Sequence, residues 1–593
     1  MRVPDFILIP VLIGSELWRR GSRRIRSGPL YQFRFSGSTP SGLTMAPKDI
    51  RPADAARAVE IYSGHYTFGE DSVSTKGESP FLANPPSQEW FSRLHTFRWL
   101  RHLQESGTEL SQANAQALVN DWIDIWGSRL NTQAWRSDIV ASRLIAWFCH
   151  SPLLLKNTSL EDFKPVLKSL ARQSRYLHHN LPHMRDGYPR LQAAIALAFS
   201  SLCLAGREKT IKSALRDLER ELSRQVLPDG THISRNPVVL LEILADLLSL
   251  KETYKTQGHG PSTEIITAID KMMGALRFFR HSNGDLAQFN GTGFTHVPLL
   301  TTILRYDTSQ GGTLQSASHS GYERLQAGNT VLLMDCGKPL SRATARRAMA
   351  GTLSFELSSG SNQFIVNCGV PESGFLHYAP FVRATAAHST ATLNDTSSSR
   401  FADDSKLHQL LPSPLIRTPE TIQTKRLDNA GAQIIQASHD GYEPHFGITH
   451  KREIELSHDG NLIHGCDTFI ASHRSAPQKN RAAIRFHLPP TISASHLSNG
   501  QSVLMAAQNN DAWTFTCIDC PISLEESIRF SGPGLPRKSE QIVLNINCSE
   551  INTVRWVLER RKKKPPSRSR KKSSSAKSSP DLLDVLEDQD TEH

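Results

Sequence analysis

The sequence has little cysteine and no long apolar run, and each shortage excludes a class of protein. Eight cysteines in 593 residues are too few for the disulfide framework of a small secreted domain. We interpret the lone CxxC of Cys517 and Cys520 as a chance pair in a strand rather than a metal or redox site. The apolar run at residues 6–14 is far shorter than the roughly 20 residues that span a bilayer.

The chain begins with this apolar run, and a basic cluster, WRRGSRRIR, follows it. A signal peptide has its positive charge before the apolar run, so no cleaved signal is expected. Two interpretations stay open: an amphipathic helix on a membrane surface, or a first helix that docks on the protein body.

The excess positive charge is concentrated at the two ends of the chain. The net charge is +11, yet residues 1–26 contain six arginines and residues 560–593 contain ten lysines and arginines. The sequence pI near 9.2 therefore says little about the folded surface. The basic termini predict an anionic membrane surface or nucleic acid as a partner, without base stacking, because no aromatic residue is interleaved. The alternative is a solvated tail that has no specific partner.

The chain of 593 residues is too long for a single hydrophobic core, since cores stop growing at roughly 250–300 residues. We expect a basic, amphipathic segment and lead-in at 1–85, then a helical domain at 86–312. A strand-rich domain is expected at 313–558, where the apolar period changes from helical spacing to two. Residues 559–593, basic and then acidic, have too little apolar content to fold and are predicted to be a disordered tail.

Successive amphipathic patterns separated by short breaks predict antiparallel helices in a toroid or array. Examples are DIVASRLIAWF, LQAAIALAFSSLCLA and VVLLEILADLLSL, and we also expect one helix over 91–103. Runs such as TLSFELSSG and NQFIVNCG predict strands of a many-stranded antiparallel sandwich. The expected fold class is therefore α+β multidomain, with an N-terminal (α/α) toroid and a C-terminal antiparallel β-sandwich.

Several motifs point to one family. LPDGTHISRNP begins at Leu227, ATARRAMAGTLSFEL at Ala343 and FVRATAAHST at Phe381, and SHDGY at Ser438 precedes His450 and Arg452. Together they resemble motifs of the heparinase II/III family of polysaccharide lyases. The resemblance implies an acidic, uronate-containing polysaccharide as partner, cleaved by β-elimination in a bacterial cell envelope or periplasm. A cytoplasmic location stays open, because the sequence shows no clear signal peptide.

The resemblance also implies roles for individual residues. β-Elimination needs donors that neutralise the uronate carboxylate, a base that removes the C5 proton and an acid for the leaving oxygen. A tyrosine near the toroid cleft, such as Tyr188, is a further candidate for proton transfer. The matching positions predict catalytic roles for Tyr442, His388, His439 and His232, and substrate binding by Arg235, Asn236, Arg383 and His450.

Each of these residues also has a structural interpretation. Asn236 before Pro237 fits a helix N-cap, and His388 fits a buried histidine that is hydrogen-bonded across strands. Asp440 and Gly441 fit a hairpin turn.

The chain departs from the family pattern where chemistry is expected. Val239 stands at the position of the family tyrosine, Met349 at that of a histidine, and Gly351 and Asn367 at carboxylate positions. Glycine and asparagine cannot replace a carboxylate as a zinc ligand, so neither a metal nor another cofactor is expected. The leading hypothesis is an enzyme, a polysaccharide lyase that cleaves an acidic glycan with a rearranged site, and the alternative is a lyase scaffold that binds an acidic glycan without cleaving it. A weaker third is tethering through the basic ends.

Overall fold

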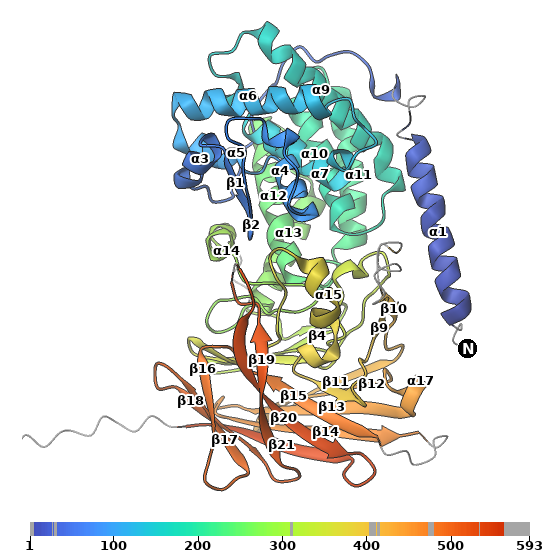
Figure 1. The fold of residues 1–593 in the computed structure, drawn as a ribbon, viewed down its shortest axis with the longest axis vertical. Helices are drawn as coiled ribbons and strands as arrows, with labels where there is room; N and C mark the ends of the chain where they lie inside the picture. Colours follow the sequence, from blue (N-terminus) through green and yellow to red (C-terminus); the bar gives the residue numbers. More distant parts are fainter. Residues whose placement is uncertain are drawn as a thin grey trace, which may run out of the picture.

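The structure is a computed structural model with a helical domain stacked on a β-sandwich and a separate N-terminal helix, α1 (Asp5–Arg26), along one side (Figure 1). The predicted order of toroid and sandwich is confirmed. The disordered tail predicted for 559–593 lies largely outside the described residues. The structure describes residues 5–26, 28, 33–308, 312–402, 411, 415–472, 480–532 and 534–561.

The helical domain is built from antiparallel helices joined by short connections. A small hairpin, β1 (His65–Phe68) with β2 (Asp71–Ser74), interrupts the segment expected to be an extended lead-in. The helices are α3 (Ala55–Tyr62), α4 (Gln88–His95), α5 (Leu100–Ser106), α6 (Glu109–Trp126), α7 (Ser137–Cys149), α8 (Ser151–Leu155), α9 (Leu160–Asn180), α10 (Tyr188–Cys203), α11 (Glu208–Gln225), α12 (Pro237–Thr256), α13 (Thr263–Phe278) and α14 (Val297–Leu304).

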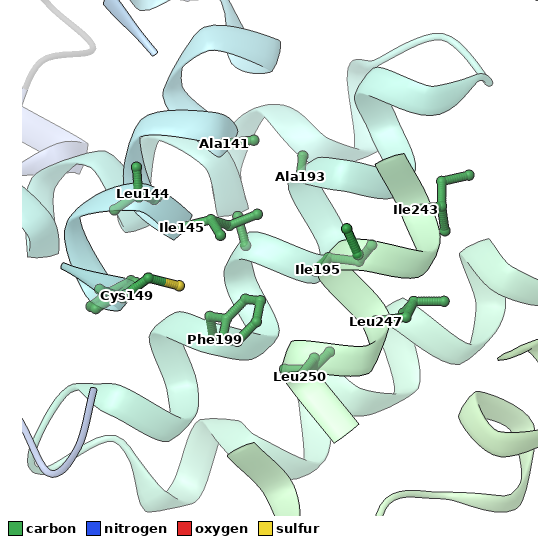
Figure 2. Packing of buried hydrophobic residues seen from close by; sticks show 14 of the residues in the cluster. Ala141, Leu144, Ile145, Cys149, Ala193, Ile195, Phe199, Ile243, Leu247 and Leu250 are labelled. Carbon is green, nitrogen blue, oxygen red and sulfur yellow. The ribbon is translucent and has the colours of Figure 1, made fainter. Parts of the chain in front are cut away.

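Three inner helices, α7, α10 and α12, form the centre of this domain. They are apolar on nearly every face, and their side chains interlock around residues such as Ile145, Phe199 and Leu247 (Figure 2). A helix that is apolar all round must be buried, which explains why the other helices surround these three.

The single helix expected over 91–103 is wrong. The chain breaks after α4 because Phe97 adopts a left-handed conformation, with φ at 56°. Phe97 is fully buried and stacks on Trp99 at 5.0 Å between ring centroids. Aromatic packing therefore overrides the helical pattern at this position.

The C-terminal domain consists of antiparallel sheets that enclose one apolar core. An eight-stranded sheet has the order β11-β12-β13-β14-β21-β18-β17-β16, and it faces a five-stranded sheet (β3-β4-β5-β6-β7) and a four-stranded sheet (β19-β20-β15-β8). The strands are β3 (Ser316–Ala317), β4 (Tyr322–Ala327), β5 (Thr330–Asp335), β6 (Phe355–Ser359), β7 (Asn362–Ile365), β8 (Ala391–Leu393), β9 (Arg400–Phe401), β10 (Leu415–Arg417), β11 (Ile422–Asp428), β12 (Ala432–His439), β13 (Ile448–Ser457), β14 (Leu462–Ala471), β15 (Arg481–His487), β16 (Ile492–His496), β17 (Ser502–Ala507), β18 (Ala512–Cys517), β19 (Ile522–Arg529), β20 (Arg537–Asn547) and β21 (Thr553–Arg560).

Aromatic residues fill the space between the sheets. Phe355 on β6 stacks on Trp556 of the opposite sheet, with ring centroids 5.7 Å apart and planes 3° from parallel. Gly465 on β14 makes this possible, because a Cβ there would lie 2.1 Å from the Trp556 ring. The Trp556 ring can therefore pack in the middle of the sandwich only because position 465 has no side chain.

Two connections differ from expectation. The strand predicted within ATARRAMAGTLSFEL begins only at Phe355, and residues 338–354 form a loop with one 3₁₀ turn, Ala345–Arg347. The turn expected at Asp440 and Gly441 is longer and contains a short helix, α17 (Glu443–Phe446). Both segments lie at the motifs that resemble the lyase family.

Candidate functional site

The LPDGTHISRNP motif forms the joint between the toroid and the sandwich. The Asp229 carboxylate accepts hydrogen bonds from the backbone N–H and hydroxyl of Ser320, at 2.8 and 3.1 Å. Arg235 donates through Nε to the Ser320 carbonyl at 2.6 Å and pairs with Asp335. Both partners of this ion pair are almost fully buried. The predicted substrate-binding Arg235 therefore lies inside the domain joint.

His232 and Asn236 of the same motif also have partners within the protein. The His232 ring nitrogens lie 2.8 Å from the Ser234 hydroxyl and 3.1 Å from Gln225 Oε1, and burial lowers the His232 pKa to about 3. Asn236 is the N-cap of α12, and its Oδ1 accepts hydrogen bonds from Val238 N and Thr292 Oγ1, at 3.0 and 2.8 Å. The geometry thus gives both residues a folding role.

The second motif surrounds His388 at the start of β8. Arg383 is buried over the rings of Phe375 and Phe401, and its Nη2 donates to the Arg346 carbonyl at 3.0 Å. His388 lies against Gly351, where an added Cβ would be only 3.2 Å from the ring. Burial lowers the His388 pKa to about 4. The ring therefore occupies space that a carboxylate side chain at position 351 would need.

Asn367, at the other expected carboxylate position, belongs to a buried network around Glu356. Its backbone N–H and side-chain amide both donate to Glu356 Oε1 at 3.1 Å, and its Oδ1 accepts from Ser389 N at 3.0 Å. His281 lies 2.9 Å from the other Glu356 oxygen, so the network joins the toroid to β6. Within the described residues, no three His, Cys, Asp or Glu side chains are grouped as metal ligands.

The third motif brings its candidate residues together, but inside the sandwich. The His439 ring lies 5.4 Å from the rings of both Tyr442 and His450. The Tyr442 hydroxyl donates to the Ala391 carbonyl at 2.6 Å, and His439 Nδ1 accepts from Gly441 N at 3.0 Å. All three rings are at most 1% exposed, so they have no open path to a polysaccharide.

Asp467 is the centre of the buried polar cluster beside them. Its carboxylate accepts hydrogen bonds from His450 Nε2 at 2.7 Å, from Arg452 Nε at 2.8 Å and from Trp556 Nε1 at 2.9 Å. Burial alone would raise the Asp467 pKa, but Arg452 and His450 hold it well below its usual range. Arg452 also donates to the carbonyls of Leu353 and Ser389, so the cluster connects the two sheets.

The sequence reasoning missed a polar network in the toroid that joins α12 to the segments around Arg51 and Arg98. Arg51 contacts Asp246 at 2.8 Å and Glu242 at 3.1 Å, and Arg98 pairs with Glu242. Burial would raise the Glu242 pKa, yet the two arginines hold it well below its usual range. These residues are scattered in sequence and form no motif, so only the packing of the helices brings them together.

Tyr188 at the start of α10 joins this network. Its hydroxyl lies 2.9 Å from Gln192 Nε2 and 3.3 Å from Arg98 Nη2. Burial raises the Tyr188 pKa, although Arg98 opposes the effect. Tyr188 is half-buried, unlike Tyr442, and Gly187 beside it lies close to Thr344 of the 338–354 loop.

The 338–354 loop lies against the helical domain at the Asn290–Gly291 turn and near Gly187 at the start of α10, and we call this region the mouth of the toroid. Met349 N donates to Asn290 Oδ1 at 3.4 Å, and Arg347 Nη1 donates to the Gly291 carbonyl at 3.5 Å. Met349 is buried, whereas Arg346 and Arg347 are exposed. The position of the family histidine is thus apolar and enclosed, and the loop presents two guanidinium groups instead.

The CxxC pair lies at the end of β18, away from this mouth. The Sγ atoms of Cys517 and Cys520 are 3.6 Å apart, and neither forms a disulfide. Cys517 is fully buried opposite Trp556 on β21. This placement agrees with a pair of cysteines that packs within the sheet.

A helical toroid joined to an antiparallel β-sandwich is the architecture of a polysaccharide-lyase scaffold. A profile of the Heparinase II/III-like C-terminal domain matches residues 309–557. FtsZ-localized protein C of Caulobacter vibrioides is 31% identical over 548 residues, which cover 90% of this chain and 93% of that protein. The chain belongs to the heparinase II/III family.

Solved structures agree on the fold. A crystal structure of heparinase III superposes with a TM-score of 0.68 at 16% identity, covering 94% of this chain and 92% of that one. Heparan sulfate lyase HepC from Pedobacter heparinus gives a TM-score of 0.57 at 14% identity, covering 92% and 87%. At such low identity these matches establish the toroid and sandwich, and the chemistry has to be argued from this chain's own residues.

Proposed function

We propose that this chain is a lyase scaffold that binds an acidic glycan at the mouth of the toroid and no longer cleaves it. The observation that carries the proposal is the filled site around Gly351. The His388 ring packs where a carboxylate would extend, and Met349 is buried at the position of a proton-transfer histidine. Asn367 is held by Glu356 and Ser389.

The proton transfers of β-elimination support the same conclusion. A base needs a pKa near the working pH and a path to the substrate. His232, His388, His439 and Tyr442 are enclosed, and burial lowers the pKa of all three histidines. Tyr188 is the accessible candidate, but its raised pKa makes the phenolate scarce at neutral pH.

The runner-up is an active lyase that uses Tyr188, with Arg98 beside its hydroxyl. Binding by calorimetry and the ultraviolet absorbance of the unsaturated product separate the two. We expect binding of an acidic glycan with flat absorbance, while an active family lyase run in parallel gives a rise. A rise with this protein that is lost in Tyr188→Phe would overturn the proposal. Binding to no acidic glycan would overturn both.

We propose a second role at a membrane surface through α1. One face of this helix packs on the sandwich through Leu8, Ile9, Leu12 and Ile13, against Ala402, Leu411 and Ile416. The opposite face carries apolar residues at helical spacing, and exposed arginines follow toward the end of the helix. Within the described part of the chain, no helix is long and apolar enough to cross a bilayer. The exposed apolar residues of α1 are Ile7 (47%), Val11 (62%), Leu17 (54%), Trp18 (78%) and Ile25 (65%).

The relative that is named for FtsZ gives this second role a cellular setting, and we propose that this chain also localises with FtsZ. Fluorescent fusions of the wild type and of Val11→Ser/Trp18→Ser test it, together with flotation on vesicles that contain anionic lipid. We expect the variant to lose vesicle binding, because the stabilising apolar burial is lost, while Phe33→Ser is a control at an exposed site outside α1. Equal flotation of both variants would contradict the membrane role. A reporter fusion shows which side of the membrane the protein occupies.

A further inference from the structure

Arg346 and Arg347 project from a rigidly held turn at the mouth of the toroid. Their neighbours Ala345 and Ala348 are buried in a small apolar cluster with Phe401 and Leu415. The buried Arg383 donates a hydrogen bond through Nη2 to the Arg346 carbonyl at 3.0 Å. The backbone of the turn is therefore fixed while both guanidinium groups remain exposed.

The acidic side chains around this turn already have partners. Asp138 accepts from Arg136 Nε at 3.1 Å, and Glu372 accepts from Arg93 Nη1 at 2.9 Å. Glu89 Oε2 accepts from the backbone N–H of Gly374 at 2.7 Å. The carboxylates that line the mouth are thus engaged by other groups.

The two exposed guanidinium groups, by contrast, form no ion pair with any described carboxylate. Arg347 Nη1 reaches the Gly291 carbonyl at 3.5 Å, and its guanidinium lies 5.0 Å from the Phe375 ring. Desolvation and then the nearby Arg136 lower the Arg346 pKa, against the opposing effects of Asp138 and Glu89. Desolvation also lowers the Arg347 pKa, with like charge from Arg346 and Arg93, against the opposing effect of Glu89. Positive charge is in excess here, and a bound anion would relieve it.

We propose that Arg346 and Arg347 form the anion-binding site of this protein, which takes the carboxylate or sulfate groups of an acidic glycan. The inference rests on the proposed glycan binding and names the residues and the chemical groups that it uses. A guanidinium group binds carboxylate or sulfate with two parallel N–H donors. Because the turn is held in advance, little backbone ordering opposes binding.

The test compares the affinity of three glycans for the full chain by calorimetry. Oligogalacturonate carries only carboxylates, dextran sulfate only sulfates, and neutral dextran neither. Arg346→Gln/Arg347→Gln removes the proposed site, and Arg216→Gln/Arg220→Gln removes the same charge from exposed positions on α11. Circular dichroism and thermal unfolding confirm that each variant is folded.

We expect the wild type to bind at least one acidic glycan and not neutral dextran. Arg346→Gln/Arg347→Gln should weaken that binding at least tenfold, and the α11 variant should bind within twofold of wild type. The preferred acidic glycan tells whether carboxylate or sulfate is the natural group.

Three results would overturn the inference in different ways. If the wild type and Arg346→Gln/Arg347→Gln bind an acidic glycan equally well, the glycan site lies elsewhere and only this inference fails. If the wild type binds none of the glycans, the proposed function fails with it. If polyglutamate binds in place of the glycans and the variant loses that binding, the arginines serve an acidic peptide instead.

Discussion

The interior of the sandwich and the mouth of the toroid have kept different parts of the family pattern. In the sandwich, His439, His450 and Arg452 persist, and all are buried in hydrogen-bonded clusters. At the mouth, positions 239 and 349 hold valine and methionine instead of the family's proton-transfer residues. The polar residues of the sandwich hold its buried clusters together, whereas the residues at positions 239 and 349 offer no group for a proton transfer.

This contrast has a physical cause. A buried charged group that loses its partner is strongly destabilising, so a substitution within the Asp467 cluster is costly even in a protein without catalysis. Val239, which is half-buried, and Met349, which is buried, are apolar and leave no charge unpaired, so replacements of this kind cost far less. Family motifs can therefore persist for folding after the reaction that they once served is lost.

The largest expected effect comes from breaking the buried cluster. We expect Asp467→Ala to reduce the free energy of unfolding by about 3–5 kcal/mol, because Arg452 is left buried without its carboxylate. Urea unfolding followed by tryptophan fluorescence measures the change. Glu526→Ala is the matched control, since both side chains of its ion pair with Lys538 are exposed and such a pair contributes little to stability. Equal losses in the two variants would show that the cluster contributes no special stability.

The next effect concerns His388, which burial keeps neutral in the folded state. Its folded pKa is lowered from 6.5 to about 4, so the unfolded chain takes up a proton more readily in that interval. Stability is therefore complete above about pH 6.5 and falls by about 1.4 kcal/mol per pH unit as the pH drops toward 4. Unfolding curves of the wild type and His388→Gln at several pH values test this. In His388→Gln the free energy of unfolding should fall less steeply between pH 6.5 and 4 than in the wild type. An equal pH dependence in the two proteins would contradict the burial argument.

The sequence was sufficient for the fold class, and the reasons are specific. The apolar sequences of α7, α10 and α12 reflect helices that are buried on nearly all faces. The alternation of apolar and polar residues in β13 and β14 reflects strands that are buried on one face. The opposition of Arg452 and Asp467 could have been inferred from the register of the β13–β14 hairpin, in which these two residues are paired. Their burial in the core was not visible in the motif itself.

The cleft was harder to predict, because it is made by contacts between distant segments. A strand was predicted for TLSFELSSG, but Leu353 adopts a left-handed conformation and the strand starts two residues later, so nothing in the sequence indicated that Arg346 and Arg347 lie exposed in a loop. Arg383 and Asn236 were predicted to bind substrate, and in the structure they hold the Arg346 turn and cap α12. A motif gives residue types, whereas exposure depends on the whole packed structure.

The smallest expected effect gives the sharpest comparison between the two regions. Tyr442→Phe removes one buried hydrogen bond to the Ala391 carbonyl and should cost about 1 kcal/mol of stability. Its glycan affinity should stay at the wild-type value, because the ring is enclosed between the sheets. Arg346→Gln/Arg347→Gln should show the reverse, with near-native stability and weak binding. If Tyr442→Phe instead loses glycan binding without losing stability, Tyr442 contacts the substrate, and the sandwich interior opens in a way that this structure does not contain.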